Sequence, residues 1–174
     1  MKKVRYGIIG VGNQGSYYAS LISEGKIPNA VIGGICDINP KKIKALEARI
    51  NLKKIPIFKD YHKMMDKKYV DAIIVTVPHY LHPIMAQECF ARNINVISDK
   101  PAGAFARQVI HMNEASKKTK ALFGMMFNQR TNCVYRKMKE IIASGGIGKL
   151  QRVTWIITDW FRTQMYYDSG SWRA

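Results

Sequence analysis

The stretch "YGIIGVGNQGSYYA", residues 6–19, decides the fold predicted for this chain. An apolar run of strand length leads into glycines at positions 10, 12 and 15, and a helical pattern follows them. Glycines at this spacing permit a tight turn, a close approach of the backbone to a pyrophosphate, and close packing of helix on strand. The free N–H groups at the start of that helix face the phosphates. The stretch therefore predicts a dinucleotide-binding turn made by Gly10, Gly12, Asn13, Gln14 and Gly15.

Short apolar runs alternate with helical patterns along most of the chain. Strands are expected at Val4–Gly10, Ala30–Cys36, Ile55–Phe58, Ala72–Val77, Ile94–Ser98 and Ala121–Met126. Helices are expected at Asn13–Glu24, Pro40 through Ile50, Tyr61–Asp66, Pro83–Arg92, Phe105–Lys118 and Val134–Ser144. The strands are apolar throughout, which is typical of a parallel sheet that helices cover on both faces. The predicted fold class is therefore α/β, with a doubly wound parallel sheet.

The pattern changes towards the C-terminus. Residues Leu150–Phe161 alternate with a period of two, which favours one long strand of an antiparallel sheet with one covered face. One strand does not make a domain. We therefore predict a dinucleotide-binding domain at residues 1–124 and the beginning of a truncated α+β domain with an antiparallel sheet at residues 125–174, and we expect the chain to be a fragment.

Asp37 closes the second predicted strand, roughly 20 residues past the last glycine of the turn. A carboxylate at this point accepts hydrogen bonds from both adenosine ribose hydroxyls and repels a 2′-phosphate, which favours NAD. Lys41 and Lys42 follow closely and soften that repulsion, so NADP stays open. The alternative role for Asp37 is a helix cap, but Asn39 supplies that cap better.

Two further segments follow strands at the same edge of the predicted sheet, where ligands bind in such folds. In "TVPHYLH", residues 76–82, Thr76, Pro78 and His82 are expected to line the cofactor, although His82 is more readily explained as a helix start than as a catalyst. In "VISDKPAG", residues 96–103, Lys100 follows the fifth strand. A lysine in a partly desolvated cleft can donate or accept a proton, but an exposed loop lysine explains its position alone equally well.

Composition argues against several classes of protein. The net charge of +16 comes from lysines and arginines in small scattered groups, which favours a solvated surface over a nucleic-acid site. Cys36, Cys89 and Cys133 are too widely spaced to suggest a metal site or a redox pair. No apolar run approaches the roughly 20 residues that span a bilayer. We expect a cytoplasmic protein with no metal, membrane or nucleic-acid partner.

Four signatures stand in order along the chain: the glycine turn, "CD" at residues 36–37, "TVPHYLH" and "DKPAG". Together with "MMFNQR" at residues 125–130 and "YYDSGSWR" at residues 166–173, they resemble the glucose-fructose oxidoreductase/inositol dehydrogenase/MocA family. The resemblance implies a Rossmann domain followed by a domain whose antiparallel sheet mediates dimers or tetramers. It also implies hydride transfer between a nicotinamide cofactor and a hydroxyl of a sugar or polyol substrate.

The resemblance implies roles for individual residues. Lys100 matches the family's lysine beside substrate and nicotinamide and is therefore the predicted catalytic residue of the intact enzyme, and the bond from Lys100 to Pro101 becomes a candidate for the cis form. Asp99 stands for the family's usual glutamate, and His79 for its usual asparagine, which puts that cofactor contact in doubt. Further cofactor contacts are implied at Asp99, Lys100 and Asn128, and substrate contacts at Arg130, Arg162, Tyr166, Trp172 and Arg173.

The chain ends before the family's catalytic histidine motif, so we expect this fragment alone to be inactive. A non-catalytic module that binds a nicotinamide dinucleotide, as a sensor or a scaffold, is the alternative function.

Overall fold

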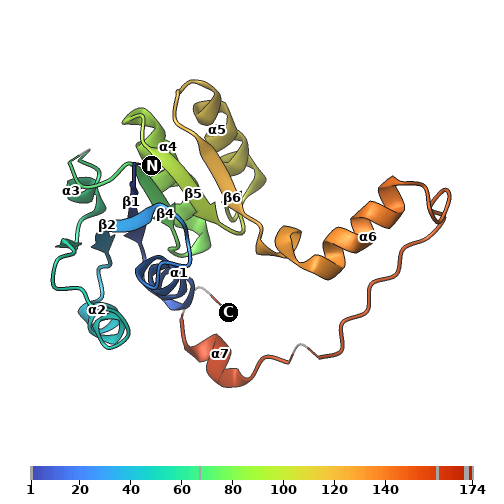
Figure 1. Ribbon diagram of the computed structural model, residues 1–174, viewed down its shortest axis with the longest axis horizontal. Helices are drawn as coiled ribbons and strands as arrows, with labels where there is room; N and C mark the ends of the chain where they lie inside the picture. The colour runs from blue at the N-terminus through green and yellow to red at the C-terminus, as the bar shows by residue number, and fades with distance from the viewer. Residues whose placement is uncertain (1, 67, 160, 171–172, 174) are drawn as a thin grey trace. The chain divides into compact units, whose positions relative to one another are not determined.

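The structure, a computed structural model, describes residues 2–66, 68–159, 161–170 and 173 (Figure 1). It divides into two compact units, residues 1–126 and 127–174, and each is described here by itself. The proposed boundary after residue 124 stays a prediction.

The first unit is built on one sheet of six parallel strands in the order β3-β2-β1-β4-β5-β6 (Figure 1). The strands are β1 (Val4–Ile9), β2 (Ala30–Cys36), β3 (Ile57–Phe58), β4 (Ala72–Val75), β5 (Asn95–Asp99) and β6 (Phe123–Met126). The chain therefore runs outward from β1 to β3 and then restarts on the other side of β1 with β4. This reversal creates a switch point between β1 and β4, where ligands bind beyond the carboxyl ends of the strands. The predicted parallel α/β fold is confirmed.

The helices of this unit are α1 (Asn13–Ser23), α2 (Pro40–Glu47), α3 (Tyr61–Met64), α4 (His82–Ala91) and α5 (Ala106–Lys117), with a 3-10 turn η1 (His79–Leu81) before α4. They form two hydrophobic cores on opposite faces of the sheet. Ile8 packs with residues of α1 and α2, whereas its neighbour Ile9 packs with residues of α3, α4 and α5. Ile74 and Ile73 divide in the same way. Successive strand residues point to opposite faces, so a sheet covered on both sides needs apolar residues at every position.

An ion pair joins β1 to β4 at the edge of the sheet away from the glycine turn. The backbone N–H and Nε of Arg5 donate to Oδ2 of Asp71 at 2.9 and 3.0 Å, and Nη2 donates to Oδ1 at 2.8 Å. These hydrogen bonds from Arg5 hold the pKa of Asp71 down at about 2.

Acid should therefore weaken the fold within a defined window. Because the pKa of Asp71 is lower in the folded chain than the ordinary value of 3.8, the pair stabilises the fold above pH 4, and this stability is lost as the pH falls towards 2. The Asp71 side chain is 30% exposed, so the loss should be only about 1 kcal/mol. Asp71→Asn should be less stable at pH 7 and should flatten this part of the pH profile of urea unfolding. Glu114→Gln, which removes an exposed carboxylate, is the control and should leave both the stability at pH 7 and the pH profile unchanged. If stability fell with pH as steeply in Asp71→Asn as in the wild type, the ion pair would not be the cause of the acid sensitivity.

The second unit contains η2 (Asn128–Thr131), α6 (Cys133–Ala143) and α7 (Gln164–Asp168). The predicted helix at 134–144 is confirmed within one residue at each end, whereas α7 was not predicted. The strand predicted at Leu150–Phe161 is wrong for the described residues of that range, which form no strand. A strand requires a neighbour that accepts and donates its backbone hydrogen bonds, and the described part of this unit offers none. The antiparallel domain stays a prediction.

Candidate functional site

Two of the three glycines in the turn are in close contact with other protein atoms, and the third has free space beside it. Gly10 has φ +87°, and a Cβ there would lie 2.7 Å from the carbonyl oxygen of Thr76. A Cβ at Gly15 would overlap the carbonyl oxygen of Gly10. By contrast, a Cβ at Gly12 would meet no atom within 4 Å. Gly10 and Gly15 are thus required by the fold itself, whereas Gly12 leaves free space above the turn, as a closely approaching ligand needs.

Helix α1 starts at this free space. Gly12 is its N-cap, and Asn13 and Gln14 are exposed in its first turn. In this fully described helix, the first turn has no acidic residue and no side chain caps it. The first N–H groups of a helix have no partner within it, and together with the helix dipole they favour a bound anion. The turn is therefore suited to hold a pyrophosphate.

Asp37 lies beside the same turn at the end of β2. Its carboxylate is held by two backbone donors, because Oδ2 accepts the N–H of Val11 at 2.9 Å and Oδ1 accepts the N–H of Asn39 at 2.8 Å. The residue is only 8% exposed. Each carboxylate oxygen can accept a further hydrogen bond, so these contacts orient Asp37 without exhausting its capacity. Asn39 caps α2 by accepting the N–H of Lys41 at 3.0 Å, which confirms the predicted cap.

Thr76 joins the end of β4 to the glycine turn across the switch point. Its hydroxyl donates towards the carbonyl oxygens of Gly10, at 2.6 Å, and Ile9, at 3.1 Å. The side chain therefore fixes the turn, and its predicted contact with a cofactor stays a prediction, as does that of Pro78 at the start of the following loop.

His82 is the first residue of α4 and is 1% exposed. Its Nε2 lies 2.8 Å from the carbonyl oxygen of Val77, and its Nδ1 lies 2.7 Å from that of Pro101. This arrangement agrees with the helix-start interpretation. A hydrogen bond from His82 to a cofactor stays a prediction, because both ring nitrogens already face protein carbonyls.

The end of β5 carries Asp99 and Lys100 in different surroundings. Asp99 is 8% exposed, and the Tyr18 hydroxyl donates to its Oδ1 at 3.4 Å. Burial, with the nearby Asp99 carboxylate, raises the pKa of Tyr18 well above its ordinary value. Lys100 is exposed in the turn that follows, and its bond to Pro101 is cis, as the resemblance suggested. Lys100 therefore leaves the same edge of the sheet as the glycine turn and Asp37.

The other candidates belong to the second unit. Asn128 and Arg130 lie in η2, and Trp172 lies outside the described residues. The ring of Tyr166, in α7, has the guanidinium of Arg162 at 4.6 Å from its centroid and that of Arg173 at 4.4 Å. The structure thus brings these three predicted residues together. Their contact with a substrate stays a prediction.

Comparison with known proteins identifies the family to which this dinucleotide-binding turn belongs. A model of the GFO_IDH_MocA oxidoreductase family, described as having an NAD-binding Rossmann fold, matches residues 4–127. The chain belongs to this family. The resemblance inferred from the sequence motifs is confirmed, and so are NAD as the family's cofactor and its assignment to oxidoreductases.

Within the family, the chain is 27% identical over 146 residues to the myo-inositol 2-dehydrogenase of Thermotoga maritima, covering 84% of this chain and 42% of that one. A crystal structure of the Bordetella pertussis WlbA dehydrogenase, in complex with NADH and UDP-GlcNAcA, has a TM-score of 0.84 at 26% identity over 99% of this chain and 51% of that one. For the Lactobacillus plantarum myo-inositol 2-dehydrogenase, the TM-score is 0.76 at 27% identity, covering 85% of this chain and 43% of that one. The chain spans less than half the length of the curated relatives it matches.

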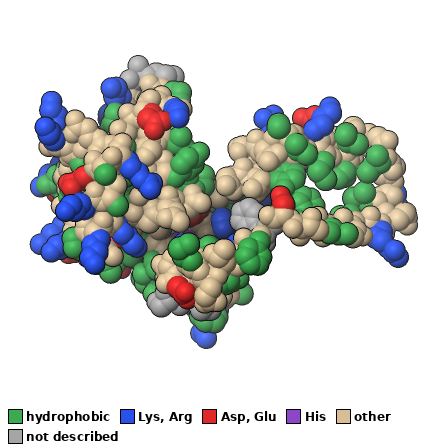
Figure 2. Space-filling model, turned by 90° about the horizontal axis from the view of Figure 1, so that it is seen from below, with side chains coloured by type: hydrophobic (Ala, Val, Ile, Leu, Met, Phe, Trp, Pro, Cys, Tyr) green, Lys and Arg blue, Asp and Glu red, His purple; other side chains and the backbone are tan. Residues whose placement is uncertain are grey.

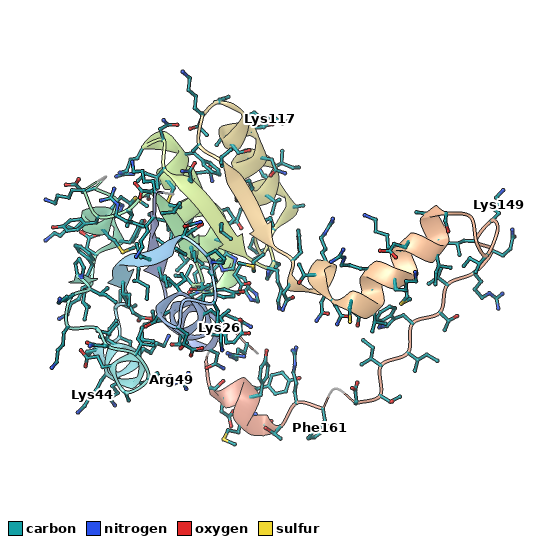
Figure 3. The ribbon with its side chains drawn as sticks, viewed as in Figure 1. Lys26, Lys44, Arg49, Lys117, Lys149 and Phe161 are labelled. Carbon is teal, nitrogen blue, oxygen red and sulfur yellow. The ribbon has the colours of Figure 1, made fainter. Side chains whose placement is uncertain are left out.

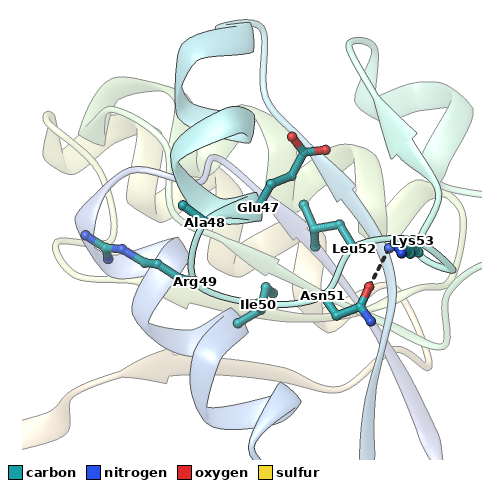
Figure 4. Close-up of a pocket in the computed structure, with 7 residues that line it drawn as sticks. All are labelled: Glu47, Ala48, Arg49, Ile50, Asn51, Leu52 and Lys53. Carbon is teal, nitrogen blue, oxygen red and sulfur yellow. Dashed lines mark hydrogen bonds between the residues drawn. The ribbon is translucent and has the colours of Figure 1, made fainter.

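Other surface features of the described residues lie apart from the glycine turn. One surface pocket, of about 570 Å³, is lined by the single continuous segment from Glu47 to Lys53 after α2, and no predicted site residue lines it (Figure 4). Lysines and arginines occur in several separate groups on the face drawn in Figure 2. The labelled Lys44, Arg49 and Lys117 point outward (Figure 3). Among the described residues, no cluster suited to a metal ion is present, and no helix is long and apolar enough to cross a membrane.

Proposed function

We propose that this chain forms the NAD-binding part of a dehydrogenase that moves a hydride between a hydroxyl of a sugar or polyol and nicotinamide. The observation that carries the proposal is the meeting of three features at one sheet edge: a turn open above Gly12, a carboxylate fixed at Asp37, and an exposed Lys100 after β5. Membership of the family supports the cofactor and the reaction class. The inositol dehydrogenases among its relatives support a polyol substrate.

The residues around the turn fit a dinucleotide. The first-turn N–H groups of α1, at Asn13 and Gln14, would bind the pyrophosphate, and Gly12 would let it approach. Asp37 would accept the ribose hydroxyls, for which its two backbone donors already orient it. The same carboxylate would repel the 2′-phosphate of NADP, so we propose NAD as the preferred cofactor.

NAD, when bound, supplies the acceptor for the hydride. The protein then has to orient the reacting hydroxyl and favour the loss of its proton. Lys100 would do both, because a positive charge beside the oxygen stabilises the negative charge that develops on it. The proton itself would pass to the histidine that the family resemblance implies in the part of the enzyme that this chain does not cover. Tyr166 and Trp172 would stack on a sugar ring, while Arg130, Arg162 and Arg173 would bind its oxygens.

The proposal is tested by titrating the chain with NADH and NADPH, following nicotinamide fluorescence. We expect NADH to bind more tightly than NADPH, and no binding of either would overturn the proposal. Activity is then measured with a panel of polyols after the chain has been joined to the part of the Thermotoga maritima enzyme that it does not cover. Binding without oxidation of any polyol would favour the non-catalytic sensor or scaffold.

Asp37→Asn should change the choice of cofactor. Loss of the negative charge should lower the ratio of the Kd for NADPH to that for NADH at least about tenfold, or about 1.4 kcal/mol. The ratio matters because any disturbance of the loop weakens the binding of both cofactors alike. Asn39→Ala is the matched control: it should cost about 1 kcal/mol of stability through the lost helix cap but leave the ratio unchanged. An unchanged ratio in Asp37→Asn would contradict the role of the carboxylate.

A further inference from the structure

A buried imidazole links the two loops that follow β4 and β5. The His82 ring lies between the carbonyl oxygen of Val77, five residues earlier, and that of Pro101, which directly follows Lys100. The contact with Val77 is local, since Val77 precedes His82 by only five residues. The contact with Pro101 is different, because it joins the start of α4 to a loop on the neighbouring strand.

The loop after β5 also rests on α4 at a second point. A Cβ added at Gly103 would lie 2.7 Å from Cγ of Pro83, the residue after His82, and 3.1 Å from Cγ2 of Val109. Residues 101 and 103 are therefore both in contact with the first turn of α4 or within reach of it. On the other side of Lys100, Asp99 pairs with Met126 in the sheet. The backbone of the exposed Lys100 is thus fixed on both sides, and His82 supplies the polar contact on one of them.

We propose that His82 is a positioning residue for Lys100 and acts through a hydrogen bond from Nδ1–H to the carbonyl of Pro101. His82 itself need not touch cofactor or substrate, because its ring is turned towards the two loops. The importance of this position of Lys100 for the reaction rests on the proposed function. The hydrogen bond to Pro101 and its effect on the loop do not depend on that function, and they are measured separately.

Two substitutions divide the ring's contacts. The amide nitrogen of asparagine stands where Nδ1 of histidine stands, and that of glutamine stands near Nε2. His82→Asn should therefore keep a donor facing the Pro101 carbonyl, whereas His82→Gln should remove that donor and place its amide near the Val77 carbonyl. A neutral imidazole donates from one ring nitrogen only, which the proposal places at Nδ1, so His82→Gln should lose the hydrogen bond to Pro101 and be less stable than His82→Asn.

The readout is backbone ¹⁵N relaxation of the chain, which reports the rigidity of single residues. In the wild type and in His82→Asn, Lys100 and Ala102 should have order parameters of about 0.85, whereas in His82→Gln these should fall below about 0.6. The glycine turn at residues 10–15 should stay rigid in all three proteins. Equal loosening in both variants, or none in either, would overturn the positioning role.

Two further measurements keep the outcomes distinct. If His82→Gln does not fold, ¹⁵N spectra of the histidine-labelled wild type decide: a protonated Nδ1 at His82 supports the proposal, and an unprotonated one overturns it. In the fused enzyme, His82→Gln should lower kcat about tenfold with a smaller change in KM, and His82→Asn should restore it. Failure of the wild type to bind NADH would refute the proposed function while leaving the result on the loop intact.

Discussion

Gly12→Ala is expected to leave the fold intact and to weaken NADH binding at least about tenfold, or about 1.4 kcal/mol. The added Cβ meets no protein atom within 4 Å, so nothing in the chain has to move. It would, however, occupy the space beside the first turn of α1 through which the pyrophosphate must approach. The measurement is an NADH titration beside a thermal unfolding curve, whose midpoint should shift by no more than about 3 °C.

Two other glycines make this prediction specific. In Gly15→Ala the Cβ would overlap the carbonyl oxygen of Gly10 and lie 2.6 Å from Oγ1 of Thr76, so stability and binding should fall together. In Gly124→Ala, in β6, the Cβ again meets nothing within 4 Å, and both stability and binding should stay near the wild-type values. If Gly12→Ala bound NADH as tightly as Gly124→Ala does, the turn would not be the site of the pyrophosphate.

The sequence predicts the sheet well because strands that are buried on both faces are apolar at every position, and such runs are easily recognised. Every position of β4, Ala72–Val75, is apolar and buried, and Ile73 and Val75 belong to one core while Ile74 belongs to the other. The ends of elements are predicted less well. The strand expected to reach Val77 stops at Val75, and the Val77 carbonyl oxygen lies 2.8 Å from Nε2 of His82 instead of pairing with a neighbouring strand. The helix expected to reach Ile50 ends at Glu47, although Ile50 is buried in the core as its apolar spacing suggested.

Contacts between residues that are far apart in the chain could not be predicted from the sequence. Periodicity indicates that Asp37 and Asp99 follow strands, but not that the first is held by the Val11 N–H or that the second lies beside the Tyr18 hydroxyl. Nothing in the spacing of His82 and Pro101 predicts that one binds the other. The residues after Leu150 show the converse error. Their alternation separates an apolar face from a polar one, but only a pairing partner makes a strand, and alternation carries no information about the partner.

Lys100→Met is expected to lower the kcat of the fused enzyme by about 10²–10³, the usual cost of removing one group that stabilises negative charge on a reacting oxygen. Methionine keeps an unbranched side chain of similar length but has no charge, so it removes the stabilisation of the developing negative charge on the substrate oxygen. Because the pyrophosphate and ribose contacts are proposed at Gly12 and Asp37, which follow β1 and β2, and not at Lys100, the Kd for NADH should change less than about threefold, or 0.6 kcal/mol.

The control for this prediction has to separate a site lysine from a surface lysine, since the chain has 28 lysines and arginines and a net charge of +16. Lys117→Met serves, because Lys117 is exposed near the end of α5 and points outward (Figure 3). Both variants lower the net charge equally, so any general electrostatic effect on an anionic cofactor is common to them. Only Lys100 leaves the edge of the sheet that carries the glycine turn. Equal activities in the two variants would mean that Lys100 is an ordinary loop lysine, whereas a loss confined to Lys100→Met would identify the charge at that edge as part of the reaction.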